Sequence, residues 1–323
     1  MISKSFSFVE ELFPSQKWQA HYEESCSAYR KWFLKEGELN RPNYLQCERM
    51  LRRHMPELIP IWEHLVNLAG GDDLTARLLS LYCPTPYVSA CSQAVWTRYS
   101  PVLIRNYDYT PSRCEGLILK SKWHSTQVIA SIDCLWGVLD GMNEHGLIVS
   151  LSFGGKNEVG KGFGIPLILR YILEFCKTTQ EATDTLCRIP SHMAYNITFM
   201  DAQFHVSTIE ISPSSPPEIS HKPFAVNHQG GFSLNNYATF SKSYEREHTL
   251  ITQLSDPNTT LESFITAFQY APLWNTNEDP NFGTVYTAIY NPSAKAVEFR
   301  WPHQIQCTQS FARFEPKDME VHY

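Results

Sequence analysis

The sequence predicts an α+β protein in which helices lie against antiparallel sheets. Apolar residues at spacings of three and four mark a helix close to the N-terminus, and a pair of helices is expected within 165–188. Strand-like segments joined by short turns stand on both sides of that helix pair. Strands followed by helices and then by more strands are typical of helices layered on antiparallel sheets.

The first ninety residues are predicted to be mostly helical. A second helix is expected over 59–68, ended by a pair of glycines, and a third begins at Asp72 or Asp73 and runs to Leu81. Prolines at 84 and 86 end this region. The apolar face of the first helix consists of Trp18, Tyr22, Cys26, Tyr29 and Phe33.

The pattern changes at residue 91, after which strands dominate. Helices are expected at 165–175 and 181–188. The chain is therefore interpreted as a helical leader, 1–90, packed on a strand-rich body, 91–323, within one folded unit. The expected hairpins pair 136–140 with 147–153, 197–200 with 206–211, and 284–290 with 297–300.

Composition excludes several classes of function. The chain has 323 residues, 43% of them hydrophobic, and a net charge of −6, so it should fold and lacks the basic surface of a nucleic-acid-binding protein. It has no apolar run long enough to span a membrane, and its first residues lack the features of a signal peptide. Nine cysteines without a CxxC pair indicate a reducing, cytoplasmic compartment and give no metal-binding signature.

Cys91 stands out among the cysteines because of its neighbours. Arg105 and Asp108 follow it by 14 and 17 residues, a separation that one β-hairpin can close. A thiol needs a base, and cleavage of the Ala90–Cys91 bond would supply one, since a free α-amine has a pKa of about 7.7–8.0. Arg105 can favour the thiolate or bind a substrate carbonyl, and Asp108 can orient the amine.

Together these segments resemble a known family. They are similar to the acyl-coenzyme A:6-aminopenicillanic acid acyltransferase-like family of N-terminal nucleophile (Ntn) hydrolases, which is related to choloylglycine hydrolase and penicillin V acylase. The resemblance extends over most of residues 50–290 and implies a four-layer αββα sandwich with self-cleavage before Cys91. It makes 1–90 a leader or propeptide and 91–323 the catalytic domain. The matching motifs are the small residue and Cys at 90–91, RNYD at 105–108, DGMNEHGLIVS at 140–150, GIPLILRYILE at 164–174, the strand at 196–201 and VNH at 226–228.

The resemblance also implies roles for individual residues. Cys91 matches the nucleophile, and Arg105 and Asp108 match the Arg and Asp of the family motif. Asn227 matches the residue whose side-chain amide helps to form the oxyanion hole. The second oxyanion donor is a backbone N–H that falls at Ser152 in this chain. A further family Arg is matched by Arg246.

Each assignment has a plainer alternative. Arg105 and Asp108 form an ordinary surface ion pair in that interpretation, and Asn227 is a turn residue. His228 invites a Cys/His dyad of the papain type, which the α-amine makes unnecessary. Four aromatic residues are candidates for an acyl pocket or for core packing: Tyr107, Tyr109, Trp123 and Trp136. The remaining eight cysteines are interpreted as core residues.

The sequence thus predicts an Ntn-type enzyme that acts on a small-molecule linear amide or thioester. Cys91 attacks the carbonyl and forms an acyl-enzyme, which water or an amine acceptor then releases. Whether the acceptor is water separates a hydrolase from an acyltransferase. No metal or organic cofactor is implied. The alternative from another class is a catalytically silent, unprocessed binding protein with the same fold.

Overall fold

The structure is a computed structural model that describes residues 2–230, 235–275 and 282–323. The helices in these residues are α1 (Gln16–Phe33), α2 (Tyr44–His54), α3 (Ile59–Leu68), α4 (Asp73–Leu79), α5 (Ile165–Phe175), α6 (Thr179–Arg188), α7 (Asn235–Phe240), α8 (Ser243–Ser255) and α9 (Leu261–Ala267). The strands are β1 (Ser3–Glu10), β2 (Ala90–Trp96), β3 (Val102–Tyr109), β4 (Leu117–Ser121), β5 (Val128–Asp133), β6 (Gly137–Asn143), β7 (Ile148–Phe153), β8 (Tyr195–Met200), β9 (Val206–Ile211), β10 (Glu218–Ser220), β11 (Phe224–Ala225), β12 (Gly283–Asn291), β13 (Ala296–Arg300), β14 (Gln306–Ser310) and β15 (Lys317–His322).

These strands build two sheets within the described part of the chain. The larger sheet has nine strands in the order β10-β9-β8-β7-β6-β5-β4-β1-β15, and the smaller has six in the order β11-β2-β3-β12-β13-β14. Neighbouring strands are antiparallel except β1 and β4, which run parallel. In the smaller sheet β2 and β3 form a hairpin in which Cys91 stands opposite Tyr107 and Ala90 opposite Asp108.

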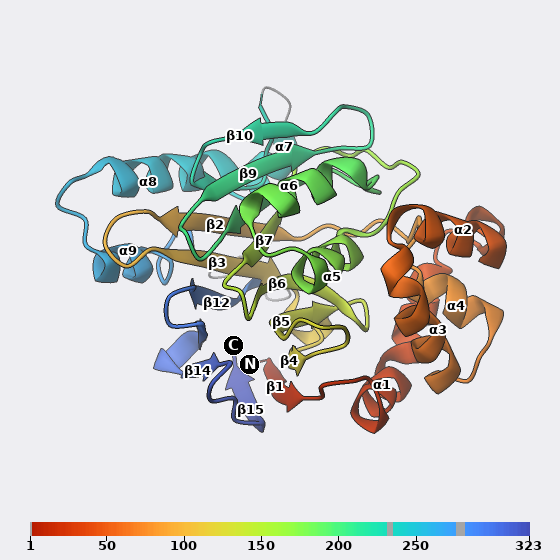
Figure 1. The fold of residues 1–323 in the computed structure, drawn as a ribbon. Coiled ribbons are helices and arrows are strands. Elements are labelled where there is room, and N and C mark those ends of the chain that lie inside the picture. The colour runs from red at the N-terminus through yellow and green to blue at the C-terminus, as the bar shows by residue number, and fades with distance from the viewer. Residues whose placement is uncertain (1, 231–234, 276–281) are drawn as a thin grey trace.

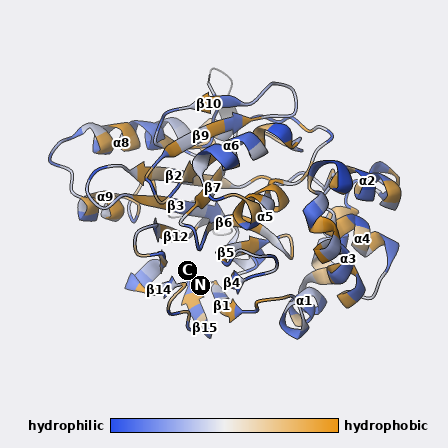
Figure 2. Cartoon of the chain, viewed as in Figure 1, coloured by the Kyte–Doolittle hydropathy of each residue, from blue (hydrophilic) through white to orange (hydrophobic). Residues whose placement is uncertain are grey.

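The two sheets face each other through β2 and β11 on one side and β7 and β8 on the other. Helices α5 and α6 cover the outer face of the larger sheet, where α5 packs on β6 and α6 on β9. Helices α8 and α9 cover the smaller sheet through Leu250 and Phe264, which share an apolar cluster with Ile104 of β3. The result is the predicted four-layer αββα arrangement (Figure 1). Helix α5, which lies between the larger sheet and the helices α1 to α4, is strongly hydrophobic (Figure 2).

The four helices α1 to α4 gather at one end of the molecule, so the predicted helical N-terminal region is present (Figure 1). Asp72 caps α4 by accepting the Thr75 N–H at 2.9 Å. Two tryptophans attach these helices to the body, because the indole N–H of Trp18 donates to Leu135 O and that of Trp136 donates to Leu79 O. Among the described helices, none has the length and apolar character needed to cross a membrane.

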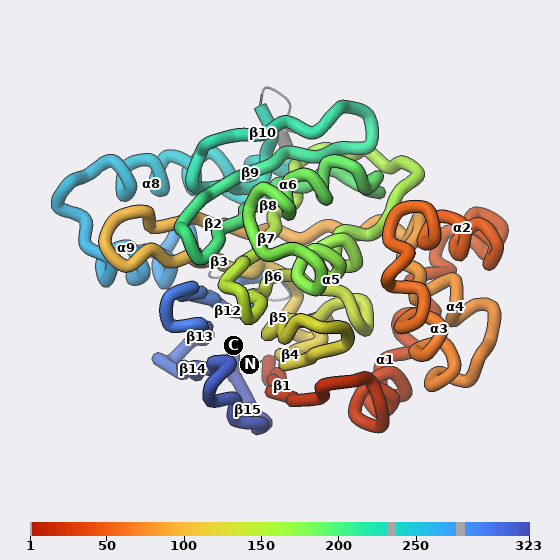
Figure 3. The backbone as a smooth tube through the Cα atoms, in the orientation of Figure 1, coloured from red at the N-terminus to blue at the C-terminus, as the bar shows by residue number. Residues whose placement is uncertain are grey.

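The first ten residues depart from the prediction of a mostly helical leader. They contain β1, which pairs with β15 on one side and with β4 on the other. Phe6 and Phe8 alternate with serines and are buried, which is the two-residue period of a strand with one covered face. The leader therefore contributes a strand to the larger sheet as well as the helices packed beside it, and its start lies next to the C-terminus (Figure 3).

Candidate active site

The β2–β3 hairpin brings Arg105 to the thiol of Cys91. The two side chains lie on the same face of the hairpin, and the Arg105 Nη2 group donates to Cys91 Sγ at 3.1 Å. Both residues are fully buried, with no exposed surface. Cys91 and Arg105 therefore lie as close together as predicted, and the positive charge of the Arg105 guanidinium is beside the sulfur.

Arg105 is itself held by the opposite sheet. Its Nε group donates to Leu151 O at 3.1 Å, and its Nη1 group forms an ion pair with Asp140 of β6. Two hydroxyl groups from β12, those of Tyr286 and Tyr290, donate to the Asp140 carboxylate. Two of the three guanidinium nitrogens are thus held, and the remaining nitrogen, Nη2, points at Cys91.

Burial and charge act on the thiol in opposite directions. Burial raises the pKa of the Cys91 thiol, while the charge and hydrogen bond of Arg105 lower the pKa of the same group without cancelling the rise. The thiol is therefore mainly protonated at neutral pH in this environment. A base close to the sulfur is needed to make it a nucleophile.

Asn227 lies at the backbone nitrogen of Cys91. Its side-chain oxygen Oδ1 accepts the Cys91 N–H at 3.0 Å, and its Nδ2 group donates to Phe153 O at 3.3 Å. Asn227 is fully buried and is separated from Cys91 by 136 residues in sequence. Its amide is thus beside the bond that would have to break before Cys91.

Asp108 occupies the other face of β3. It follows Tyr107 in the strand, and its carboxylate accepts the Thr284 hydroxyl at 2.6 Å and pairs with Arg246 of α8. Burial raises the pKa of the Asp108 carboxyl, and the Arg246 charge opposes that rise. In this continuous strand Asn227 bonds the backbone nitrogen of Cys91, and the orientation of a free α-amine by Asp108 stays a prediction.

Ser152 and Arg246 both support neighbouring parts of the site. The Ser152 hydroxyl of β7 donates to Val226 O at 2.8 Å, directly before Asn227. Arg246 is turned toward Asp108 and donates from Nε to Pro272 O. Both residues are buried, and none of the hydrogen bonds or ion pairs described for their side chains is to Cys91.

His228 points away from the thiol. Its ring nitrogens bond the Ser243 hydroxyl at 2.8 Å and the Glu247 carboxylate at 3.1 Å, both on α8. The ring also packs on Tyr244, with 4.6 Å between the ring centres. These contacts do not form a papain-type dyad with Cys91.

The four candidate pocket aromatics separate into two groups. Tyr107 and Tyr109 stack at 5.7 Å on β3, beside Cys91. Trp123 and Trp136 stack at 6.3 Å elsewhere, where Trp136 bonds the leader and Arg170 of α5 lies over Trp123. Only the two tyrosines are near the nucleophile candidate.

Several residues of the site were absent from the sequence prediction. The sequence places Asp140 only at the start of a hairpin motif, and Tyr286 and Tyr290 only within a predicted strand. The spacing of the two tyrosines by four, on one strand, places both on the same face. This spacing was the signal in the sequence that the two tyrosines point the same way. That they contact Asp140 depends on how the two sheets pack together.

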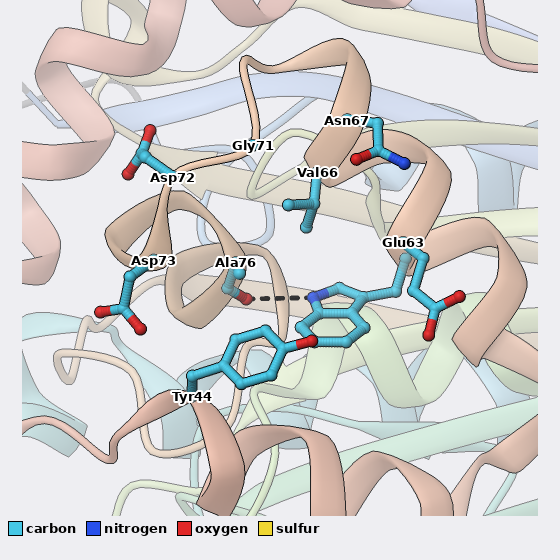
Figure 4. Close-up of a pocket in the computed structure, with 9 residues that line it drawn as sticks. Tyr44, Glu63, Val66, Asn67, Gly71, Asp72, Asp73 and Ala76 are labelled. Atoms are coloured by element: carbon cyan, nitrogen blue, oxygen red, sulfur yellow. Dashed lines mark hydrogen bonds between the residues drawn. The ribbon is translucent and has the colours of Figure 1, made fainter.

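A separate pocket of about 480 Å³ lies among the leader helices, lined in part by Tyr44, Glu63, Asp72 and Asp73 (Figure 4). It contains no residue of the Cys91 site. Its acidic groups already have partners, since Asp72 pairs with Arg30. Within residues 2–230, 235–275 and 282–323, no group of three or more His, Cys, Asp or Glu side chains could hold a metal ion.

Comparison with solved structures found similar folds at low sequence identity. Penicillin V acylase from Agrobacterium tumefaciens has 14% identity and a TM-score of 0.43, over 69% of this chain and 86% of that one. A mutant conjugated bile acid hydrolase from Clostridium perfringens has 10% identity and a TM-score of 0.46, over 72% and 97%. The N-acylethanolamine-hydrolyzing acid amidase ortholog from Caenorhabditis elegans has 16% identity and a TM-score of 0.45, over 72% and 100%.

No match was found among curated proteins. The family model described as acyl-coenzyme A:6-aminopenicillanic acid acyl-transferase matches residues 96–306, well over half of the chain. The matched region begins after Cys91 and contains Arg105, Asp108 and Asn227. The resemblance noted from the sequence motifs is confirmed by this match. The chain belongs to the acyl-coenzyme A:6-aminopenicillanic acid acyl-transferase family.

Proposed function

We propose that the protein is an N-terminal cysteine nucleophile enzyme that acts on a linear amide or thioester and is activated by cleavage between Ala90 and Cys91. One observation carries this proposal. The Cys91 sulfur accepts a hydrogen bond from Arg105, while the Cys91 nitrogen donates to Asn227 Oδ1. The two atoms that an N-terminal cysteine uses, sulfur and nitrogen, therefore each have a dedicated polar partner in a buried site.

Activation begins with attack of the Cys91 sulfur on the Ala90 carbonyl carbon. A C–S bond forms, the Ala90–Cys91 C–N bond breaks, and the thiol proton goes to the departing nitrogen. Water then hydrolyses the thioester, which leaves a carboxylate at Ala90 and an α-amine at Cys91. Asn227 keeps its bond to that nitrogen throughout and holds the new amine beside the thiol.

Turnover uses the same pair of atoms. The α-amine takes the thiol proton as the sulfur attacks the substrate carbonyl, and the resulting oxyanion needs hydrogen-bond donors. The Asn227 Nδ2 group is one donor, because its present bond to Phe153 O is long at 3.3 Å and is readily exchanged. The amine then returns the proton to the leaving group, and water or an amine acceptor releases the acyl group.

The first experiment tests activation. Denaturing electrophoresis and N-terminal sequencing of fresh protein should show fragments 1–90 and 91–323, the larger one beginning CSQAVW. Cys91→Ala should stay intact, whereas the matched control Cys307→Ala should be cleaved as wild type. A wild-type chain that stays whole under turnover conditions would contradict the amine-base mechanism.

The second experiment tests turnover with N-acyl p-nitroanilides of increasing acyl length. Release of nitroaniline should depend on Cys91, and intact-mass measurement should show one acyl group on the fragment 91–323. Addition of a primary amine separates the two enzyme classes. A hydrolase gives the free acid in its presence, and an acyltransferase gives the new amide.

The complete burial of Cys91 favours a second candidate, a catalytically silent protein that binds ligands without processing. In that case the chain stays intact and no acyl group is found on Cys91. Binding of the same anilides, measured by calorimetry, would then be the same in Cys91→Ala as in wild type.

A further inference from the structure

The loop that carries Asn227 is held by hydrogen bonds from both sides. The hydroxyl of Ser152 and the side-chain amide of Asn196 both donate to Val226 O, and the same Asn196 amide donates to His228 O at 3.0 Å. These contacts come from the larger sheet. On the opposite side, the backbone N–H of Asn227 donates to the Ser243 hydroxyl at 2.9 Å.

The Ser243 contact continues to the surface as a chain of hydrogen bonds. Ser243 Oγ lies 2.8 Å from His228 Nδ1, and His228 Nε2 lies 3.1 Å from a Glu247 carboxylate oxygen. An ionised carboxylate only accepts hydrogen bonds, so His228 Nε2 carries the proton. In the neutral ring Nδ1 is then an acceptor, and the Ser243 hydroxyl donates to it. The lone pairs of Ser243 Oγ are thereby directed at the N–H of Asn227.

Helix α8 presents these groups on one face. Ser243, Arg246 and Glu247 are spaced by three and four residues, the spacing of neighbours on a helix surface. Ser243 reaches Asn227, Glu247 reaches His228, and Arg246 reaches Asp108. One helix face thus contacts the site at three points without touching Cys91.

We propose that Ser243, oriented by His228 and Glu247, is the positioning residue for Asn227. The proposal rests on the proposed function, because it assigns Asn227 a part in the chemistry. Without the Ser243 hydroxyl, the buried Asn227 N–H has lost its acceptor, and the loop must move to regain one. A shift of this kind displaces the side chain that bonds the Cys91 nitrogen, and small displacements at a reacting centre are costly in rate.

The test compares Ser243→Ala with Thr252→Ala, which removes a hydroxyl from the same helix at an exposed site bonded only to a backbone carbonyl. The kcat of Ser243→Ala on an N-acyl p-nitroanilide should fall about tenfold or more with KM unchanged, because one oxyanion donor is typically worth about 10²–10³ in rate. Thr252→Ala should match wild type. Hydrogen exchange of the peptide containing Asn227 should be faster in Ser243→Ala than in Thr252→Ala or wild type.

Glu247 provides a second variant that disturbs the core less. Glu247→Gln keeps an oxygen that accepts from His228 and should retain most of kcat, whereas Glu247→Ala should lower kcat and speed exchange at Asn227. Equal activity in these two variants would contradict the role of His228 and Glu247. A Ser243→Ala kcat close to the Thr252→Ala value, or unchanged exchange at Asn227, overturns the assignment of Ser243.

The two proposals fail in different ways. If Cys91→Ala turns over substrate as wild type does, or wild type does not turn over any anilide, the proposed function fails and the positioning role falls with it. If turnover depends on Cys91 but Ser243→Ala keeps full kcat, only the positioning role fails.

Discussion

Asp108 and Arg246 form a buried ion pair that joins β3 to α8, with 2.6 Å between Arg246 Nη1 and Asp108 Oδ2. Neither side chain is more than 1% exposed. Thr284 donates to the second carboxylate oxygen, and Pro272 O accepts from the Arg246 Nε group. The pair therefore connects the strand next to Cys91 with the helix that supports Asn227.

Loss of one partner of this pair should be severe. In Arg246→Ala the Asp108 carboxylate is left buried without a counter-charge, which is expected to lower the free energy of unfolding by about 3–5 kcal/mol in urea at neutral pH. The double variant Asp108→Asn/Arg246→Ala should recover part of that loss, because the charge is gone as well. Arg313→Ala breaks an exposed pair with Glu315 and should change little. No recovery in the double variant would contradict the charge argument.

Arg105→Lys tests the contact with the thiol. Lysine keeps the charge but cannot bond Asp140, Leu151 O and Cys91 Sγ at once, since it lacks the planar fork. Turnover should fall on the order of 10² or more. The pH at which Cys91 reacts with iodoacetamide should also rise, but only by the share of the pKa lowering that comes from the Arg105 hydrogen bond, because lysine keeps the charge. Peptide mass spectrometry measures this reaction, and exposed Cys187 in the same digest is the control.

A second buried cluster joins the leader to the body. Asp133, at the end of β5, accepts hydrogen bonds from Tyr29 of α1 and from Tyr87, four residues before Cys91. Burial and the neighbouring Glu115 carboxylate raise the pKa of Asp133 to about 7. Burial alone would lower the pKa of His21, but its contact with Glu115 leaves that pKa raised.

This cluster predicts a contribution to stability that falls as pH rises. The ordinary pKa of an Asp is about 3.9, so between pH 4 and 7 the folded protein holds a proton on Asp133 that the unfolded chain has released. The raised pKa of His21 acts in the same direction near neutrality. The stability that Asp133 contributes, measured by urea unfolding as the difference between wild type and Asp133→Asn, should therefore be larger at pH 5 than at pH 8. A difference that is the same at both pH values would refute the assignment.

Cleavage before Cys91 should not release the leader. Its β1 strand lies between β4 and β15, and α1 and α4 are bonded to the body through Trp18 and Trp136. Fragments 1–90 and 91–323 should co-elute in gel filtration and separate only in denaturant. Elution of a lone 91–323 fragment that remains folded would contradict the role of β1 as an internal strand.

The sequence predicted best the segments whose local pattern is strong. The helices at 59–68 and 165–175 and the strand at 206–211 have the predicted bounds, because apolar periodicity and flanking turn residues define them. Strands β1 and β15 were not predicted. Strand β15 pairs with β1 across more than three hundred residues of sequence. The alternation of Phe6 and Phe8 with serines is a local signal for a strand, but it does not report which strands β1 pairs with.

The site divides in the same way. Arg105 was placed beside Cys91 from the length of one hairpin, which is a local property. Asp140 holds Arg105 only because two sheets face each other, and Ser243 supports Asn227 only because α8 folds over the smaller sheet. The family role of Asn227 came from the VNH motif, but its contact with the Cys91 nitrogen required the fold.

The pairing of Ile2 with Tyr323 offers a route to a form of this chain that, under the proposed mechanism, needs no self-cleavage. Ile2 and Tyr323 exchange backbone hydrogen bonds, so a short turn could join them as it joins two hairpin strands. A circularly permuted gene could then start at Cys91 and end at Ala90, with the leader following the body in one continuous polypeptide. Once its initiator methionine is removed, this permutant would carry the α-amine from synthesis onward and keep β1 in the sheet. Its activity, compared with that of the native order, would separate the chemistry of turnover from the chemistry of maturation.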